Sequence, residues 1–276
     1  MTDPPGVTGT RSRLPVTLLA AAHPGPAFAV TVLAGLLSVA MHLPADRVVL
    51  VVAAVLTGQL SIGWSNDLLD VARDRRVGRT DKPLATGAVP LSAARTACVV
   101  AVVLTIPLGL ACGLAVGGVH LLGTAAGWVY NLGMKGTVWS WLPYVVCFGG
   151  LPVLVALART DPALPAVWLP VVGALLGVGA HLLNVLPDLA DDAATGVRGL
   201  PHRLGARRTS LVAVTLLAVA SVVAVVGAGV SLIPAVLAFV VVAALALFAL
   251  RGAGRVPFLA AVGIALVDVV LLVAAS

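Results

Sequence analysis

Apolar runs of 18 or more residues recur along the whole of this 276-residue chain, and they constrain its fold more than any other feature. A helix of that length crosses a hydrocarbon layer of about 30 Å. Charged residues make up 10% of the chain and the mean hydropathy is +1.11, which is too apolar for a soluble core. No segment alternates like a barrel strand, and backbone groups in lipid need internal hydrogen bonds. The sequence therefore predicts an all-α, polytopic membrane protein.

The apolar runs divide into nine candidate membrane-spanning helices. Their boundaries are roughly 16–43, 47–69, 91–113, 118–134, 141–158, 163–187, 209–229, 231–250 and 256–275. The first run is interrupted by His23-Pro24-Gly25-Pro26, so its spanning part is expected to begin near Pro26. Residues 1–15 lack a signal-peptide cleavage pattern and are interpreted as a short cytoplasmic tail. Residues 16–276 are expected to form a single membrane domain.

Basic residues gather on one predicted side of the membrane. Fifteen of the seventeen lysines and arginines fall on the side of the N-terminus, and only Arg47 and Arg159 fall on the other. The positive-inside rule therefore places the N-terminus in the cytoplasm and the C-terminus outside. This topology accounts for the net charge of +6, so no nucleic-acid partner is expected. The composition favours a bacterial source, and the expected location is the bacterial inner or plasma membrane.

The carboxylates are as unevenly distributed as the basic residues. The chain has no glutamate, and seven of its eleven aspartates lie in two segments on the basic side. The first segment, "SNDLLDVARDRRVGRTDKPLATG", carries Asp67, Asp70, Asp74 and Asp81. The second, "HLLNVLPDLADDAATGVRGLPHRLG", carries Asp188, Asp191 and Asp192.

Both segments repeat the register N-x-x-x-D-x-x-x-D. At about 100° per residue, each projects its members from one face of a continued helix. The two sets are Asn66, Asp70 and Asp74, and Asn184, Asp188 and Asp192. Like charges this close repel one another unless a cation intervenes. Carboxylate and amide oxygens suit Mg²⁺, which joins one or two carboxylates to substrate phosphates. Two such faces opposite each other would suit a Mg²⁺-bridged diphosphate, with nearby cations neutralising the remaining phosphate charge. Those cations are Arg79, Lys82, Arg198 and Arg203.

The strings "NDLLDVARD" and "GRTDKPLATGAVPLSAAR" resemble the first Asp-rich motif and following basic loop of the UbiA family of intramembrane prenyltransferases. "NVLPDLADDAATGVRGLPHRLGARR" resembles that family's second Asp-rich motif. The resemblance covers nearly the whole chain and implies nine helices around a central apolar cavity. It also implies that the Asn and Asp residues of both registers hold Mg²⁺ and diphosphate. "VYNLGMK" adds Tyr130 and Lys135, with Lys135 at the diphosphate.

The resemblance implies transfer of a prenyl group from a polyprenyl diphosphate to an aromatic or other lipophilic acceptor within the bilayer. Asp67 and Asp191 flank the ligand positions, where each would orient a phosphate-binding cation or act as a base. The sequence barely separates prenyl transfer from the activity of a UbiA-type terpene cyclase. In such a cyclase, the carbocation left by the departing diphosphate is captured by an alkene of the same molecule. A divalent-cation transporter is a remote alternative, because the acids lie at one membrane face rather than at mid-depth.

Other polar residues of the spans carry weaker signals. Asp268 lies inside the last span with no evident partner, which makes it either a functional group or a carboxyl bonded to a neighbouring helix. His181 precedes Asn184 by one turn, and it either faces the cavity mouth or packs. His23 is interpreted as an interhelical hydrogen-bonding residue, and Tyr144 as a membrane-interface anchor.

Overall fold

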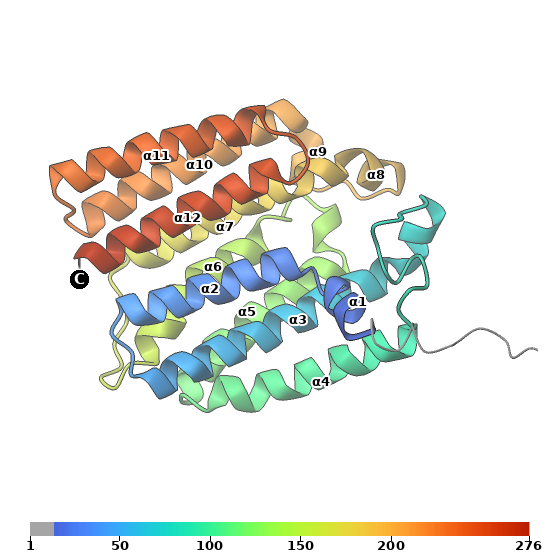
Figure 1. Cartoon of the computed structure of the whole chain (residues 1–276), viewed down its shortest axis with the longest axis horizontal. Coiled ribbons are helices and arrows are strands. Elements are labelled where there is room, and N and C mark those ends of the chain that lie inside the picture. The colour runs from blue at the N-terminus through green and yellow to red at the C-terminus, as the bar shows by residue number, and fades with distance from the viewer. Residues whose placement is uncertain (1–13, 276) are drawn as a thin grey trace, which may run out of the picture.

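The computed structural model describes residues 14–275, and within that range every regular element is helical (Figure 1). The helices are α1 (Leu14–Ala20), α2 (Pro24–Ala40), α3 (Ala45–Arg76), α4 (Leu91–Leu110), α5 (Leu114–Leu132), η1 (Met134–Gly136), α6 (Leu142–Leu157), α7 (Trp168–Val185), η2 (Leu186–Asp188), α8 (Leu189–Ala194), α9 (Leu200–Leu204), α10 (Ala206–Gly227), α11 (Leu232–Arg251) and α12 (Val256–Ala275). The predicted all-α class is confirmed. Most of the predicted tail lies outside the described residues.

Each predicted span overlaps one of the long helices, but the count of nine spans is not confirmed. Five helices of the described range are long and apolar enough to cross a membrane, namely α3, α4, α7 with its extension to Ala194, α10 and α11. A sixth span results when α1 and α2 are taken together. Helix α6 and the Val256–Leu272 part of α12 are apolar but shorter.

The first predicted span is two helices that meet at an angle of 77°. The break falls at His23, which adopts a left-handed conformation (φ 51°), and Pro24 opens α2. Proline is suited to the first turn of a helix but cannot continue one, because it lacks an N–H group. The break packs tightly on α3, where a side chain at Gly63 would collide with the carbonyl of Ala22. This contact fixes His23 beside the end of α3 that carries the aspartates.

The two acidic segments differ in backbone conformation. Helix α3 runs without interruption through 32 residues to Arg76, so at about 1.5 Å per residue it extends well beyond a 30 Å hydrocarbon layer. After α7, the 3-10 turn η2 intervenes before α8. The single continued helix predicted here is therefore wrong in detail. Pro187 has no N–H to donate, and the tighter turn interrupts the 100° register between Asn184 and Asp192.

The long helices pack side by side in one bundle (Figure 1). Helix α3 contacts α2, α4 and α5, and α7 contacts α6, α10 and α12. Figure 1 shows α8, α9 and the α3–α4 loop at one end of the bundle and the C-terminus at the other. The segments that carry the aspartates therefore share one end of the molecule.

Candidate functional site

Two arginines from the first acidic segment reach the second. Arg79 lies in the loop after α3, and its Nη1 donates to Oδ1 of Asp188 at 2.8 Å. The same nitrogen lies 3.7 Å from Oδ2 of Asp191. Arg73, on α3, places Nη2 3.7 Å from Oδ1 of Asp192. Segments about a hundred residues apart in sequence thus face each other across a layer of guanidinium groups.

The α3 face carries the buried carboxylates Asp70 and Asp74. Lys135, on η1, places Nζ 2.6 Å from both carboxylate oxygens of Asp70. Arg73 donates to Oδ2 of Asp70 at 2.8 Å and lies 3.8 Å from Oδ1 of Asp74. Asn66 Oδ1 accepts from Lys135 at 3.5 Å. Two of the predicted ligands on α3, Asn66 and Asp70, therefore contact the lysine that the sequence places at the diphosphate, and Asp74 lies beside Arg73.

Asp67 turns toward a different pair of basic groups. Its Oδ1 lies 2.7 Å from Lys82 Nζ and 2.7 Å from His23 Nε2, and those two nitrogens are 2.8 Å apart. The Asp67 side chain is 2% exposed. Its Oδ2 has no hydrogen-bond partner within the described part of the chain. A carboxylate shared by a lysine and a histidine positions both groups at the mouth of the site. The hydrogen bond from His23, at the α1–α2 break, to Asp67 of α3 confirms the prediction that His23 forms an interhelical hydrogen bond.

The Arg79 guanidinium is held by a second carboxylate in its own loop. Its Nε and Nη2 donate in parallel to the two oxygens of Asp81, each at 2.8 Å. The hydrogen bond from Arg79 lowers the pKa of Asp81 to about 2. The same hydrogen bond raises the pKa of Arg79 above its ordinary value. A bidentate pair of this kind fixes the guanidinium plane, so Asp81 determines where Arg79 points.

Two other residues predicted to bind the diphosphate, Arg198 and Arg203, lie outside the ion pairs between the two acidic faces. Arg198 and Arg203 are exposed, and neither forms an ion pair with the two acidic faces in the described structure. His202, between them on α9, places Nε2 3.7 Å from Oδ2 of Asp192. Burial lowers the pKa of His202. No sequence signal had marked this histidine.

The chemistry of the site suits Mg²⁺, although the ligands are divided between two faces. Within residues 14–275, no group of three or more acidic, histidine or cysteine side chains is close enough to hold an ion by itself. Mg²⁺ usually takes one or two protein carboxylates, and water and substrate phosphates complete its shell. The oxygens of Asn66, Asp70 and Asp74, facing those of Asp188 and Asp192, fit that division. A diphosphate between the faces would supply the missing ligands.

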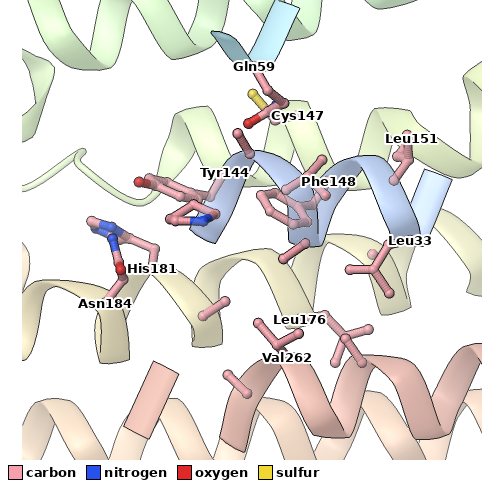
Figure 2. A pocket seen from close by; sticks show the side chains of 18 of the residues that line it. Leu33, Gln59, Tyr144, Cys147, Phe148, Leu151, Leu176, His181, Asn184 and Val262 are labelled. Carbon is pink, nitrogen blue, oxygen red and sulfur yellow. The ribbon is translucent and has the colours of Figure 1, made fainter. Parts of the chain in front are cut away.

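An apolar cavity of about 220 Å³ opens beside these residues. Asn66, His23 and Asn184 line it at the end of the bundle that carries the aspartates. Farther from that end, its walls come from α2, α3, α6, α7 and α12 and are mostly apolar. Figure 2 shows Gln59 and Cys147 on one wall and Leu176 and Val262 on the opposite wall. The cavity can hold a hydrocarbon chain whose polar end meets the two acidic faces.

Three rings form a cluster between the acidic end and the apolar walls. Tyr144 stacks on His181 with ring centroids 4.2 Å apart. Tyr130 meets both edge to face, at 5.4 Å from Tyr144 and 5.5 Å from His181. All three line the cavity, and Figure 2 shows Tyr144 and His181 there. The interpretation of Tyr144 as an interface anchor is therefore wrong. Its helical spacing with Phe148 and Leu151, at i+4 and i+7, was the sequence signal for a shared cavity-facing stripe.

A sequence profile of the UbiA prenyltransferase family matches residues 27–257. The chain belongs to the UbiA prenyltransferase family. Its helical arrangement is similar to a UbiA homologue from Archaeoglobus fulgidus bound to GPP and Mg²⁺, with a TM-score of 0.67 and 15% identity over 94% of this chain and 99% of that one. A UbiA homologue from Aeropyrum pernix K1 gives a TM-score of 0.71 and 16% identity over 95% and 98%. At these identities the likeness shows the fold alone.

Among UbiA-related sequences, the chain is similar to the bacteriochlorophyll synthase 33 kDa chain of Cereibacter sphaeroides. The two are 31% identical over 186 residues, which is 62% of this chain and 60% of that protein. The corresponding protein of Rhodobacter capsulatus is 26% identical over 191 residues, covering 63% and 62%. The chain thus spans about three fifths of the length of the curated relatives that it matches.

Proposed function

We propose that this UbiA-family protein catalyses the Mg²⁺-dependent transfer of a prenyl group from a polyprenyl diphosphate to a lipophilic acceptor inside the membrane. One observation carries the proposal: two aspartate faces, bridged by Arg73 and Arg79, stand at the mouth of an apolar cavity. Solved UbiA homologues bound to GPP or DMAPP with Mg²⁺ support it. The relatives that synthesise bacteriochlorophyll support a large lipophilic acceptor.

The metal would be held by Asn66, Asp70 and Asp74 on one face, and by Asn184, Asp188 and Asp192 on the other. When bound, Mg²⁺ supplies positive charge that neutralises the diphosphate as it leaves. Arg79, Lys82 and Lys135 donate hydrogen bonds to the diphosphate oxygens. These bonds stabilise the negative charge that develops on the diphosphate as the allylic C–O bond breaks. In this proposal Asp67 and Asp191 position cations rather than remove protons, since each contacts a basic side chain.

The rest of the prenyl chain lies between the helices, where the apolar walls exclude water that would quench the cation. In this proposal the rings of Tyr130 and Tyr144, which line the cavity, stabilise a cation at the first carbons of the chain. The acceptor supplies an electron pair for the new bond to the first prenyl carbon, and diphosphate departs with the electrons of the broken C–O bond. The alkylated atom of the acceptor, or its neighbour, then gives up a proton, and the departing diphosphate takes up that proton.

In the proposed topology, the acidic end faces the cytoplasm of a bacterial cell and the C-terminus lies outside. The loops at that end carry most of the basic residues, which favours this orientation. All nine long helices would then span the bilayer, with α6 and α12 sheltered by their neighbours.

The test is incubation of the purified protein with Mg²⁺ and prenyl diphosphates of increasing length, with and without a phenolic or quinone-precursor lipid fraction. Mass spectrometry of all extracted products should show a prenylated lipid only when that fraction is present.

Hydroxybenzoate should be a poor acceptor, because the chain between Arg13 and Arg47 has only His23 and His42 as basic groups, and of these only His23 lines the cavity. Efficient conversion of prenyl diphosphate alone to a cyclic product would replace transfer with terpene cyclisation. Release of divalent cations from loaded liposomes, without any product, would instead indicate a transporter.

A further inference from the structure

Asp268 is a buried carboxyl group in the wall of the cavity, far from the two aspartate faces. It lies on α12 and is 1% exposed. Its Oδ2 accepts a hydrogen bond from Ser221 Oγ of α10 at 3.1 Å. Its Oδ1 has no hydrogen-bond partner among the residues that the structure describes. The same residue lines the apolar cavity, so an oxygen without a donor among the described residues lies buried in the cavity wall.

The position of Asp268 along α12 gives its depth. Helix α12 begins at the end of the bundle that carries α8 and α9 and runs toward the opposite end (Figure 1). Phe258, Ala261, Ala265 and Asp268 all line the cavity. The ten positions from Phe258 to Asp268 correspond to about 15 Å along the helix axis. Asp268 therefore lies well inside the apolar part of the cavity, away from the atoms that react.

Oδ1 is an acceptor whether the carboxyl group is ionised or protonated at Oδ2. Ser221 Oγ lies 3.3 Å from the carbonyl of Leu217 as well as 3.1 Å from Asp268 Oδ2. If the carboxyl is ionised, Ser221 donates to Oδ2. If it is protonated at Oδ2, that oxygen donates to Ser221, and Oδ1 remains a carbonyl oxygen. Both arrangements leave lone pairs on Oδ1, and a buried acceptor without a donor is destabilising.

A prenyl chain cannot satisfy this oxygen, because it is hydrocarbon beyond its diphosphate. The donor must come from another molecule in the cavity. We infer that Asp268 forms a hydrogen-bonding subsite for a hydroxyl or N–H group carried by the lipophilic acceptor. This inference rests on the proposed function and narrows its substrate class. The acceptor is an elongated, largely apolar molecule whose hydrogen-bond donor reaches Asp268, roughly 15 Å deeper along the axis of α12 than Phe258.

The subsite is tested by binding, without turnover. The protein in lipid nanodiscs is equilibrated with tritiated 1-hexadecanol, and hexadecyl methyl ether is the matched ligand that lacks the donor. Wild type should bind the alcohol about tenfold more tightly than the ether, which corresponds to about 1.4 kcal/mol. Asp268→Leu should abolish this preference, and Asp268→Asn, which keeps an acceptor oxygen, should retain it. Ser221→Ala, which breaks only the link to α10, should also retain it.

An equal affinity of wild type for alcohol and ether would overturn the inference, and a water molecule would then be the only partner of Oδ1. Two other results would also overturn it: the preference for the alcohol over the ether survives Asp268→Leu, or it is lost equally in Ser221→Ala. Either result would mean that Asp268 only joins α12 to α10 through Ser221 and does not bind the ligand. If Asp268→Leu does not insert, infrared difference spectroscopy decides the question. Hexadecanol should shift a carboxyl band of wild type that is missing from Asp268→Asn, and no shift contradicts the subsite. A protein that shows the preference but no prenyl transfer would contradict the proposed function alone.

Discussion

Arg79 Nη1 lies 2.8 Å from Oδ1 of Asp188, so one guanidinium group joins the loop after α3 to the segment after α7. The other edge of that guanidinium is held by both oxygens of Asp81. Arg79 thus stands between the two aspartate faces in a fixed orientation. In the proposed reaction, the diphosphate binds between those faces and accepts a hydrogen bond from Arg79.

Arg79→Ala should raise the KM for prenyl diphosphate at least tenfold and lower kcat, because a charge-assisted contact to the leaving group is lost. Arg198→Ala and Arg203→Ala should change either constant by less than threefold, since both side chains are exposed and outside the ion-pair layer. Steady-state kinetics with geranylgeranyl diphosphate measure all three variants. A larger effect at Arg198 or Arg203 than at Arg79 would assign the diphosphate to the α8–α9 loop instead.

Asp81→Asn should raise the KM for prenyl diphosphate several-fold without abolishing turnover, because Arg79 loses its bidentate partner but keeps its charge. The pKa of Asp81 is lowered to about 2, below its unfolded value of about 3.9. The ion pair is therefore complete above the unfolded pKa and is lost only as the pH falls through about 2. The KM ratio of variant to wild type should consequently be constant from pH 5 to pH 8. A ratio that converges toward one at pH 5 would contradict this account of Asp81.

Leu33→Trp should shorten the longest prenyl donor that the protein accepts, because Leu33 projects into the cavity from α2 (Figure 2). Geranyl diphosphate should remain a substrate, and geranylgeranyl diphosphate should lose most of its kcat/KM. Val32→Trp is the matched control, since Val32 is 51% exposed on the outer face of the same helix. An unchanged chain-length profile in Leu33→Trp would mean that the prenyl chain lies elsewhere.

The proposed topology predicts the accessibility of single cysteines in a background without Cys98, Cys112 and Cys147. A cysteine at Thr80, an exposed position in the α3–α4 loop, should resist an impermeant thiol reagent in intact cells. A cysteine at Thr160, exposed after α6, should react. Both should react after permeabilisation, which is the control for insertion. The opposite pattern in intact cells would invert the orientation.

The all-helical class followed from the length of the apolar runs, because hydrocarbon leaves a spanning chain few alternatives. The approach of the two aspartate segments was anticipated from their repeated register. The sequence could not show that Pro187 would introduce the 3-10 turn η2, since a proline is also compatible with a simple kink. Nor could it distinguish Arg79 from Arg198, because the partner of a loop arginine depends on how the loop folds back.

Tyr144 was misjudged for a related reason. It is near a span boundary, where an aromatic ring fits a membrane-interface role equally well. Its actual surroundings depend on long-range packing, namely the contact of α6 with α7 around His181. Such contacts join residues that are far apart in sequence, and no local pattern encodes them.

The most direct test of the central claim is the rate of prenyl diphosphate consumption when each aspartate face is removed separately. The double variants Asp70→Asn/Asp74→Asn and Asp188→Asn/Asp192→Asn should each lower kcat at least a hundredfold, with Asp161→Asn, an exposed aspartate outside both segments, as the control at wild-type rate. EDTA should abolish wild-type turnover and added Mg²⁺ should restore it. Turnover near the wild-type rate in either double variant, or in the presence of EDTA, would contradict a metal-bridged diphosphate held between the two faces.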